Sequence, residues 1–304
     1  MWLPKDEWQP LWLPKDEWKP LGLPNNKKMI DSHQHFWNYN EERDTWITPD
    51  MGRIRRDFYP LEAEAIFLER GITGCIAVQA DQSEEETLFL LSLAEQNTFI
   101  KGVVGWVDLQ DDSIEEKLEY FSQFEDLKGF RHIVQGEIDP NFLQRPNFSR
   151  GVKLLNAFDY TYDLLIYPHQ LASGIQFCQV HNQQKIVLDH LAKAPLKSGD
   201  ISQWKKEMQG FKSLDHVSAK ISGIVTEANW TNWKEEEILG LIDVALETFG
   251  PNRLMFGSDY PVVLVAAELD QWLEIYAKSI EKLSVYEQEL INSKNCLSFY
   301  QTEA

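Results

Sequence analysis

The sequence predicts a single (β/α)8 barrel, and two observations carry this prediction. Strand-like and helix-like segments alternate eight times, and polar residues gather at one end of the strand-like segments. The alternation spans roughly 270 residues, which suits eight strand–helix units. An open, doubly wound sheet is the alternative, but no glycine-rich phosphate-binding motif follows an early strand.

Composition and charge exclude several classes of protein. The 304 residues are 43% hydrophobic, with 29 Lys and Arg against 48 Asp and Glu, so the net charge is −19. Such an acidic chain lacks the basic face that nucleic-acid binding or docking on an anionic membrane requires. No apolar run approaches the roughly 20 residues of a membrane-spanning helix. Three widely spaced cysteines (Cys75, Cys178 and Cys296) argue against a disulfide framework and a cysteine zinc site. Without a signal-peptide pattern, we expect a cytoplasmic protein.

The chain opens on a ten-residue repeat, MWLPKDEWQP followed by LWLPKDEWKP. Prolines in each copy prevent a continuous helix, and two copies are too few for a solenoid. We assign residues 1–28 to an N-terminal repeat extension and 29–304 to the barrel domain. The alternative is an arm whose tryptophans pack on the barrel or on a partner subunit, and a homodimer is left open.

From Met29 onward, eight short runs rich in apolar and β-branched residues are predicted strands. Their ranges are 29–36, 74–80, 101–109, 128–135, 162–170, 185–193, 216–224 and 253–261. Amphipathic stretches between them predict helices, such as 83–97, 174–184 and 232–250. Ser83 and Glu86 suggest a capping box at the start of the first of these helices.

A long connection, residues 36–60, follows the first predicted strand. Connections of this length in a compact fold are often binding loops or lids. Its four arginines would either attract an anionic sugar acid or pair with local acids: Arg43, Arg53, Arg55 and Arg56.

The predicted strands are apolar where they start and polar where they end, although a buried parallel strand should be apolar throughout. Five of the seven histidines lie at such ends, together with an arginine and two aspartates. These residues are His33, His35, Arg131, His132, His169, Asp189, His190 and Asp259. Because the carboxyl ends of barrel strands form the face that carries active sites, this pattern indicates an enzyme.

The His33-Gln34-His35 sequence on the first strand is the sharpest of these signals. Alternate residues of a strand share a face, so Asp31, His33 and His35 should point together into the lumen. Two imidazoles on one strand can bind a cation or a carbonyl oxygen. Asp259, ending the eighth strand, would meet them across the closed barrel.

Six stretches then resemble the amidohydrolase superfamily, and within it the sugar lactonase branch of the amidohydrolase-2 group, which includes L-fuconolactonase-like and L-rhamnonolactonase-like enzymes. They are IDSHQHFW, FRHIVQ, YPHQL, LDHLAK, AKISGIVTEA and LMFGSDYPV. The resemblance runs from about Met29 to the C-terminus. It implies a barrel hydrolase that opens a small sugar-acid lactone by water attack on the carbonyl.

The resemblance also implies roles for individual residues. Asp259 matches the general base, while His33, His35 and His169 match the histidines that hold a metal or the carbonyl. His190 is a further catalytic candidate, with a core histidine as the alternative. A turn residue before Pro261 is the alternative for Asp259, and a loop residue is the alternative for His169.

A two-metal centre is not expected, because the fourth strand reads Phe130-Arg131-His132 and lacks the bridging lysine or carboxylate of binuclear members. One divalent ion, such as zinc, on His33, His35 and Asp259 is one version of the site. The other version has no metal, and histidine and arginine side chains polarise the carbonyl.

Four residues are candidates for contacting the substrate. Arg131 is favoured over His132 as the lumen-facing residue of strand four. Lys220 lies in an apolar strand, so it should meet a carboxylate or the ligand. Trp37 and Trp106 would form an apolar wall for a sugar ring, with core packing as the alternative. Other functions left open are a 2-pyrone-4,6-dicarboxylate-type lactonase, a metal-dependent decarboxylase and a non-catalytic sugar-acid binding protein.

Overall fold

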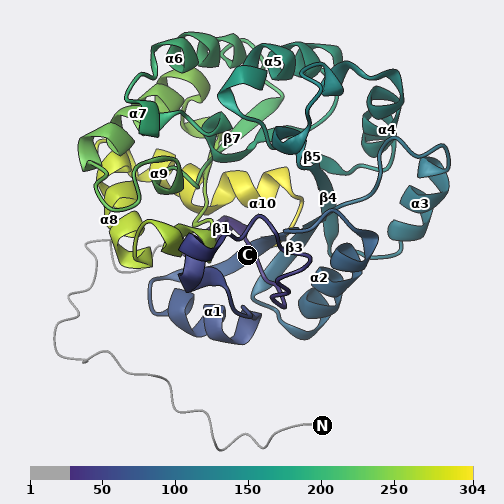
Figure 1. Cartoon of the computed structure of the whole chain (residues 1–304), viewed down its shortest axis with the longest axis horizontal. Helices are drawn as coiled ribbons and strands as arrows, with labels where there is room; N and C mark the ends of the chain where they lie inside the picture. The colour runs from purple at the N-terminus through teal and green to yellow at the C-terminus, as the bar shows by residue number, and fades with distance from the viewer. Residues whose placement is uncertain (1–27, 304) are drawn as a thin grey trace, which may run out of the picture.

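The computed structural model describes residues 28–303, which form one eight-stranded parallel barrel ringed by helices (Figure 1). Each strand pairs with the next one in the sequence, from β1 to β8. The predicted (β/α)8 barrel is therefore confirmed. The repeat assigned to residues 1–28 lies outside the described residues except for Lys28, so its separation from the barrel stays a prediction. Within residues 28–303, no helix has the length and apolar character needed to cross a bilayer.

All eight predicted strands exist, but their carboxyl ends come earlier than the sequence pattern indicated. The strands are β1 (Met29–Gln34), β2 (Ile72–Val78), β3 (Ile100–Gly105), β4 (Leu127–His132), β5 (Thr161–Leu164), β6 (Ile186–Leu188), β7 (Val217–Ile221) and β8 (Leu254–Phe256). The polar residues beyond these ends leave the hydrogen-bonded ladder and form short turns, which extends the loops at this end of the barrel.

Helices follow the strands and cover the outside of the barrel (Figure 1). They are α1 (Pro60–Leu68), α2 (Glu84–Gln96), α3 (Ile114–Phe121), α4 (Pro146–Ala157), α5 (Leu171–Val180), α6 (Ser202–Met208), α7 (Glu235–Phe249) and α8 (Leu269–Ile280), followed by α9 (Val285–Glu289) and α10 (Asn295–Phe299). Ser83 caps α2, since its Oγ accepts from the Glu86 amide at 3.2 Å. The Glu86 carboxylate accepts from the Ala80 amide instead of completing the predicted capping box.

The first and last strands close the barrel through the chain that follows β8. The Asp259 amide donates to the His33 carbonyl at 2.9 Å, and the His35 amide donates to the Tyr260 carbonyl at 2.8 Å. One step earlier, the Ser32 hydroxyl donates to the Phe256 carbonyl at 2.6 Å. This closure places the ends of β1 and β8 side by side.

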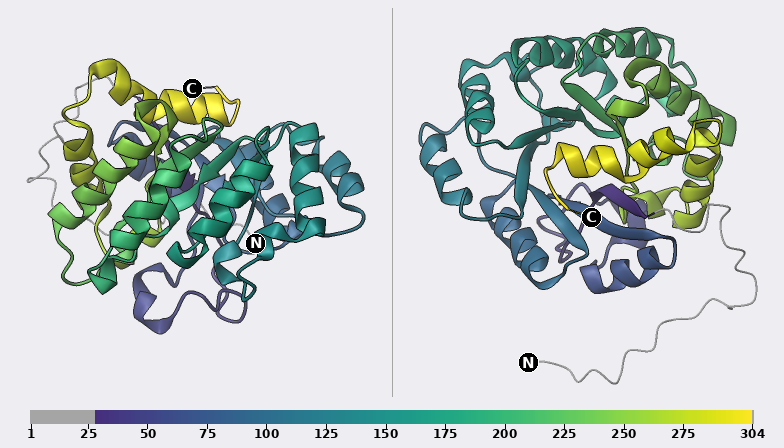
Figure 2. Two further views of the ribbon diagram at one scale, coloured as in Figure 1. Left: turned by 90° about the horizontal axis from the view of Figure 1, so that it is seen from above. Right: turned by 180° about the vertical axis from the view of Figure 1, so that it is seen from behind.

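The C-terminal segment covers the amino end of the barrel, opposite the polar ends of the strands. Seen from behind, α10 lies across the middle of the ring (Figure 2). Asn295 donates to the carbonyl of Leu254, the first residue of β8, at 2.6 Å. Cys296 and Tyr300 are buried in a cluster with lumen residues of five strands: Ile30, Ile76, Val78, Val104, Val187 and Met255. The lumen at the amino end of the barrel is therefore filled mainly by apolar side chains.

Close contact between α4 and the segment after β3 requires a glycine at position 151. A Cβ there would lie 2.0 Å from the Leu109 carbonyl oxygen, which belongs to the backbone and cannot move aside easily. We expect Gly151→Ala to lower the free energy of unfolding by at least about 1–3 kcal/mol, as overpacking does.

The matched control is Gly240→Ala on α7, where a Cβ would meet nothing within 4 Å. This substitution should raise the free energy of unfolding by about 0.5–1 kcal/mol, because alanine loses less backbone entropy than glycine. Urea unfolding of both variants measures the difference. Equal stabilities would contradict the described packing.

Candidate active site

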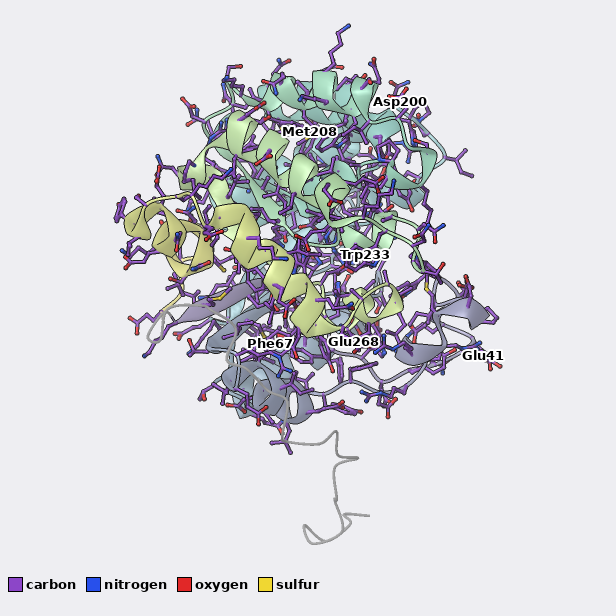
Figure 3. All side chains as sticks on the ribbon, turned by 90° about the vertical axis from the view of Figure 1, so that its left-hand side faces the viewer. Glu41, Phe67, Asp200, Met208, Trp233 and Glu268 are labelled. Carbon is purple, nitrogen blue, oxygen red and sulfur yellow. The ribbon has the colours of Figure 1, made fainter. Side chains whose placement is uncertain are left out.

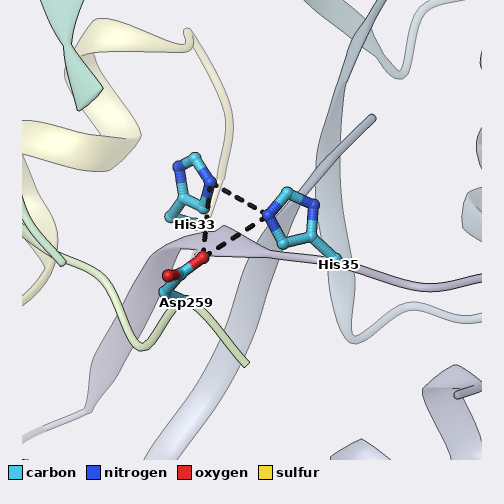
Figure 4. A group of neighbouring side chains, drawn as sticks. All are labelled: His33, His35 and Asp259. Carbon is cyan, nitrogen blue, oxygen red and sulfur yellow. Dashed lines mark hydrogen bonds and ion pairs between the residues drawn. The ribbon is translucent and has the colours of Figure 1, made fainter. Parts of the chain in front are cut away.

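Three side chains from the two ends of the chain meet inside the barrel (Figure 4). The Nε2 atoms of His33 and His35 are 3.2 Å apart. The Asp259 Oδ1 atom lies 3.5 Å from His35 Nε2 and 3.9 Å from His33 Nε2. All three residues are buried. The structure therefore brings together the two histidines of β1 and the aspartate after β8.

Asp31 holds the end of β1 against the segment that follows β8. Its carboxylate accepts from the backbone amides of His33 at 3.0 Å and Ser258 at 2.8 Å, and from the Ser258 hydroxyl. Burial raises the pKa of Asp31 to about 7, against the lowering effect of these hydrogen bonds. Asp31 therefore tethers β1 to the segment that carries Asp259, a role the sequence pattern did not reveal.

The donor atoms have the spacing and chemistry of a divalent metal site. Ligands about 2.0–2.1 Å from a tetrahedral zinc ion lie roughly 3.3 Å from one another, close to the three separations between these donor atoms. His35 Nδ1 is 2.7 Å from the Val78 carbonyl, which can only accept, so Nδ1 carries the hydrogen. The nitrogen left to bind a metal ion is therefore Nε2, which faces the other two candidate ligand atoms. The group His33, His35 and Asp259 can hold a divalent ion.

His190 joins the cluster because the chain leaves β6 in an unusual conformation. Residues 190–193 all have φ between 51° and 54°, a left-handed turn that non-glycine residues rarely adopt. The ring of His190 packs edge-on against His33, with centroids 4.4 Å apart, and its Nδ1 is 2.9 Å from the Ser222 hydroxyl. His190 Nε2 is 4.0 Å from Asp259 Oδ1. Burial lowers the pKa of His190 to about 4.

Gly223 is required beside these two side chains. Its φ is +61°, and a Cβ there would lie 2.4 Å from His190 Nδ1 and 3.0 Å from Asp259 Oδ2. Burial alone would raise the pKa of Asp259, but the neighbouring His190 and His35 outweigh it and hold that pKa below its usual value. Asp259 also lies in a left-handed turn before Pro261, with φ of 57°, as the alternative interpretation expected. Its carboxylate nevertheless faces the imidazoles of His33 and His35.

Arg131 also belongs to the cluster. Its Nη1 atom is 3.1 Å from Asp189 Oδ2 and 3.3 Å from His33 Nε2, and its Nη2 donates to the Gln79 carbonyl. The neighbouring His132 points elsewhere, with Nε2 2.8 Å from a Glu137 carboxylate oxygen. Of the two residues at the end of β4, Arg131 is the one beside the histidines.

Lys220 lies beneath the cluster and is fully buried. Its ammonium contacts Asp163, Asp189 at 3.1 Å and His33 Nδ1 at 3.1 Å. The sequence led us to expect that Lys220 meets either a carboxylate or the ligand, and it meets two carboxylates. Because Lys220 is fully buried beneath His33, its assignment as a residue that contacts the substrate is corrected. Asp163 was missed, although a charged residue inside a buried parallel strand is the same signal that identified Lys220.

His169 does not join the cluster, which corrects its expected place beside His33 and His35. β5 ends at Leu164, and His169 follows on a 3-10 turn, Pro168–Gln170. Its side chain is exposed, and its ring stacks with Tyr167 at a centroid distance of 6.1 Å. The predicted strand was too long, so its last histidine was assigned to the wrong place.

The two candidate tryptophans differ. Trp37 is 1% exposed, packs against Phe58 and donates to the Arg56 carbonyl at 2.8 Å, so the core-packing alternative describes it. Trp106 follows β3 and is half-buried. Among residues 28–303, its Nε1 atom has no hydrogen-bond partner.

The arginines of the connection between β1 and α1 pair with acids near the surface. The four pairs are Arg43–Asp44, Arg53–Glu268, Arg55–Glu41 and Arg56–Glu62. Figure 3 shows Glu41 at the outer edge of this connection. Of the two alternatives, pairing with acids is the one that the structure shows, and Arg53 links the connection to the start of α8.

Comparison with known proteins identifies the family of this chain. The chain is 38% identical over 273 residues to an L-fucono-1,5-lactonase of Burkholderia multivorans. The aligned residues cover 86% of this chain and 92% of that protein. An L-fucono-1,5-lactonase of Burkholderia ambifaria is 29% identical, covering 80% and 83% of the two chains. A crystal structure of a Burkholderia multivorans amidohydrolase with bound zinc superposes with a TM-score of 0.88 at 37% identity, covering 91% and 100%. The Amidohydrolase family matches residues 30–301, and the chain belongs to that family.

Proposed function

We propose that this protein is a lactonase that opens an L-fucono-1,5-lactone or a closely related sugar-acid lactone. The observation that carries the proposal is the buried Asp259 carboxylate held against His33 and His35, in a chain 38% identical to an L-fucono-1,5-lactonase. The substrate class is therefore a small molecule, and the L-rhamnono-lactone is the competing choice within it. A cytoplasmic location and a homodimer stay predictions.

The reaction needs a base, a polarised carbonyl and a proton for the leaving oxygen. Asp259 is ionised and takes a proton from the attacking water as the oxygen of that water bonds to the lactone carbonyl carbon. The bond from that carbon to the ring oxygen then breaks, and Asp259 returns the proton to this oxygen. The product is a single open-chain hydroxy acid, because the carbonyl carbon and the ring oxygen belong to the same molecule.

Arg131 is the side chain best suited to the charge that develops on the carbonyl oxygen. Its guanidinium lies beside His33 and is held in place by Asp189 and the Gln79 carbonyl. His190 is neutral near pH 7, because its pKa is about 4. Its Nε2 atom, 4.0 Å from Asp259 Oδ1, can therefore form a hydrogen bond with the attacking water or the lactone. Trp106, just beyond the end of β3, has a buried Nε1 atom without a hydrogen-bond partner among residues 28–303.

A single zinc ion is the proposed cofactor, with His33, His35 and Asp259 as the residues that would hold it. The bound ion would polarise the carbonyl and lower the pKa of a water molecule. A second ion is not proposed, because Arg131 and Lys220 already neutralise Asp189, the carboxylate that a second site would need.

The direct experiment is a panel of aldonolactones, assayed by acid release with a pH indicator. We expect turnover of L-fucono-1,5-lactone to exceed that of the L-rhamnono-lactones. Release of carbon dioxide from an aromatic acid would instead favour a decarboxylase, and tight binding of every lactone without turnover would favour a binding protein.

At a zinc concentration that saturates the variant, Asp259→Asn should lower kcat by at least about 10²–10⁴-fold with little change in KM, because the amide keeps the shape and removes the base. Steady-state kinetics on the preferred lactone measure this. The control is Asp243→Asn, an exposed aspartate on α7, which should behave as wild type. If Asp259→Asn keeps more than about a tenth of the wild-type kcat, the base is another group, with His190 as the first candidate.

Zinc binding should require His35 and Asp259. We expect one equivalent in the wild-type protein, and His35→Gln or Asp259→Asn should weaken binding by more than the roughly 10–100-fold that loss of an outer-shell partner costs. Competition with a chromophoric chelator measures this without substrate. His216→Gln is the control, because His216 contacts the Cys178 carbonyl outside the cluster. Two tightly bound equivalents, both needed for turnover, would contradict the single site.

A further inference from the structure

The hydroxyl of Tyr300 reaches from the C-terminal segment into the polar part of the barrel. Tyr300 follows α10 and is 1% exposed. Its hydroxyl donates to the Asp163 carboxylate, with Oη 3.0 Å from Oδ1 and 2.9 Å from Oδ2. Asp163 lies on β5, so the C-terminal segment touches a strand that carries none of the clustered histidines.

Asp163 connects Tyr300 to the candidate active site through Lys220. The Asp163 carboxylate accepts from the Lys220 ammonium, and that ammonium lies 3.1 Å from His33 Nδ1. Asp189 is the second carboxylate on Lys220, at 3.1 Å. Asp163, Lys220 and His33 are all 0% exposed, so no bulk water competes for these contacts. A continuous chain of contacts thus runs from Tyr300 to a histidine of the cluster.

The orientation of the Lys220 ammonium depends on its carboxylate partners. An ammonium has three donors and no acceptor, and it rotates freely on a flexible stem. Two carboxylates and His33 Nδ1 occupy the Lys220 ammonium here. Tyr300 lies near both oxygens of Asp163 and so restrains rotation of that carboxylate. In a low-dielectric interior, such a network is stiff only when each member is satisfied.

We propose that Tyr300 is a positioning residue that sets the orientation of the His33 ring through Asp163 and Lys220. The inference rests on the proposed lactonase function for its kinetic consequence and on the contacts alone for its structural one. Tyr300 touches neither substrate nor reacting atoms. It lies at the amino end of the barrel and acts on a side chain at the carboxyl end.

Tyr300→Phe isolates the hydroxyl. The phenyl ring keeps the packing in the barrel floor and stays near the Lys220 ammonium, which lies 5.5 Å from the ring centroid. Tyr276→Phe is the matched control, because Tyr276 on α8 is equally buried and donates to Asn292 at 2.5 Å outside the network. Both variants lose one buried hydrogen bond, so thermal unfolding should show similar losses of stability.

Only Tyr300→Phe should change catalysis. We expect kcat to fall about tenfold with KM within twofold of wild type, which is the scale of one charge-assisted hydrogen bond. In an Asp163→Asn background, Tyr300→Phe should add less than about twofold, because residues in one network are not additive. A purely structural role would lower stability and leave kcat unchanged.

Imidazole ¹⁵N NMR at fixed pH gives a readout that needs no turnover. The resonances of His33, identified by their loss in His33→Gln, should move in Tyr300→Phe and stay in place in Tyr276→Phe. Unchanged His33 resonances with kcat equal to that of Tyr276→Phe would overturn the proposal. If the wild-type protein opens no lactone, the proposed function fails, while the NMR comparison still decides whether Tyr300 positions His33.

Discussion

The closure of β1 against the chain that follows β8 is the constraint on which the rest of the site depends. Backbone hydrogen bonds join Asp259 to the His33 carbonyl and His35 to the Tyr260 carbonyl. Asp31 reinforces this closure by accepting hydrogen bonds from Ser258. Because main-chain atoms make these contacts, the distance between the carboxylate and the two imidazoles does not depend on side-chain rotamers alone. Residues more than 220 positions apart in the sequence therefore form one rigid group of donors.

Buried charges beside this group pair with one another. Asp189 lies between Arg131 and Lys220, and Asp163 lies between Lys220 and Tyr300. Buried ion pairs add little net stability because desolvation offsets their attraction, yet losing one partner is costly. Such a network is better understood as a means of orienting His33 and Arg131 than as a source of stability. The two cations also neutralise Asp189, the carboxylate that a second metal site would need.

The conformation at the end of β6 shows how the fold tolerates local strain beside reacting groups. Left-handed geometry costs roughly 1–2 kcal/mol per non-glycine residue, and four such residues follow one another from His190. Packing compensates: Leu191 and Ala192 are buried, and Trp204 donates to the Leu191 carbonyl at 2.8 Å. The turn directs the His190 ring toward Asp259, and Gly223 leaves room for both. Strained conformations of this kind concentrate at functional sites.

The sequence alone determined the eightfold alternation, the polar end of the strands, and the group formed by His33, His35 and Asp259. These features follow from local periodicity and from the rule that parallel strands are buried. Only the tertiary structure decided where each strand ends, and so excluded His169 from the cluster. It also decided which way buried side chains face: Trp37 packs in the core, and Lys220 lies beneath the site. The link from Tyr300 to His33 could not be predicted either, because it depends on how the C-terminal segment packs into the barrel, and no local pattern encodes contacts at that separation.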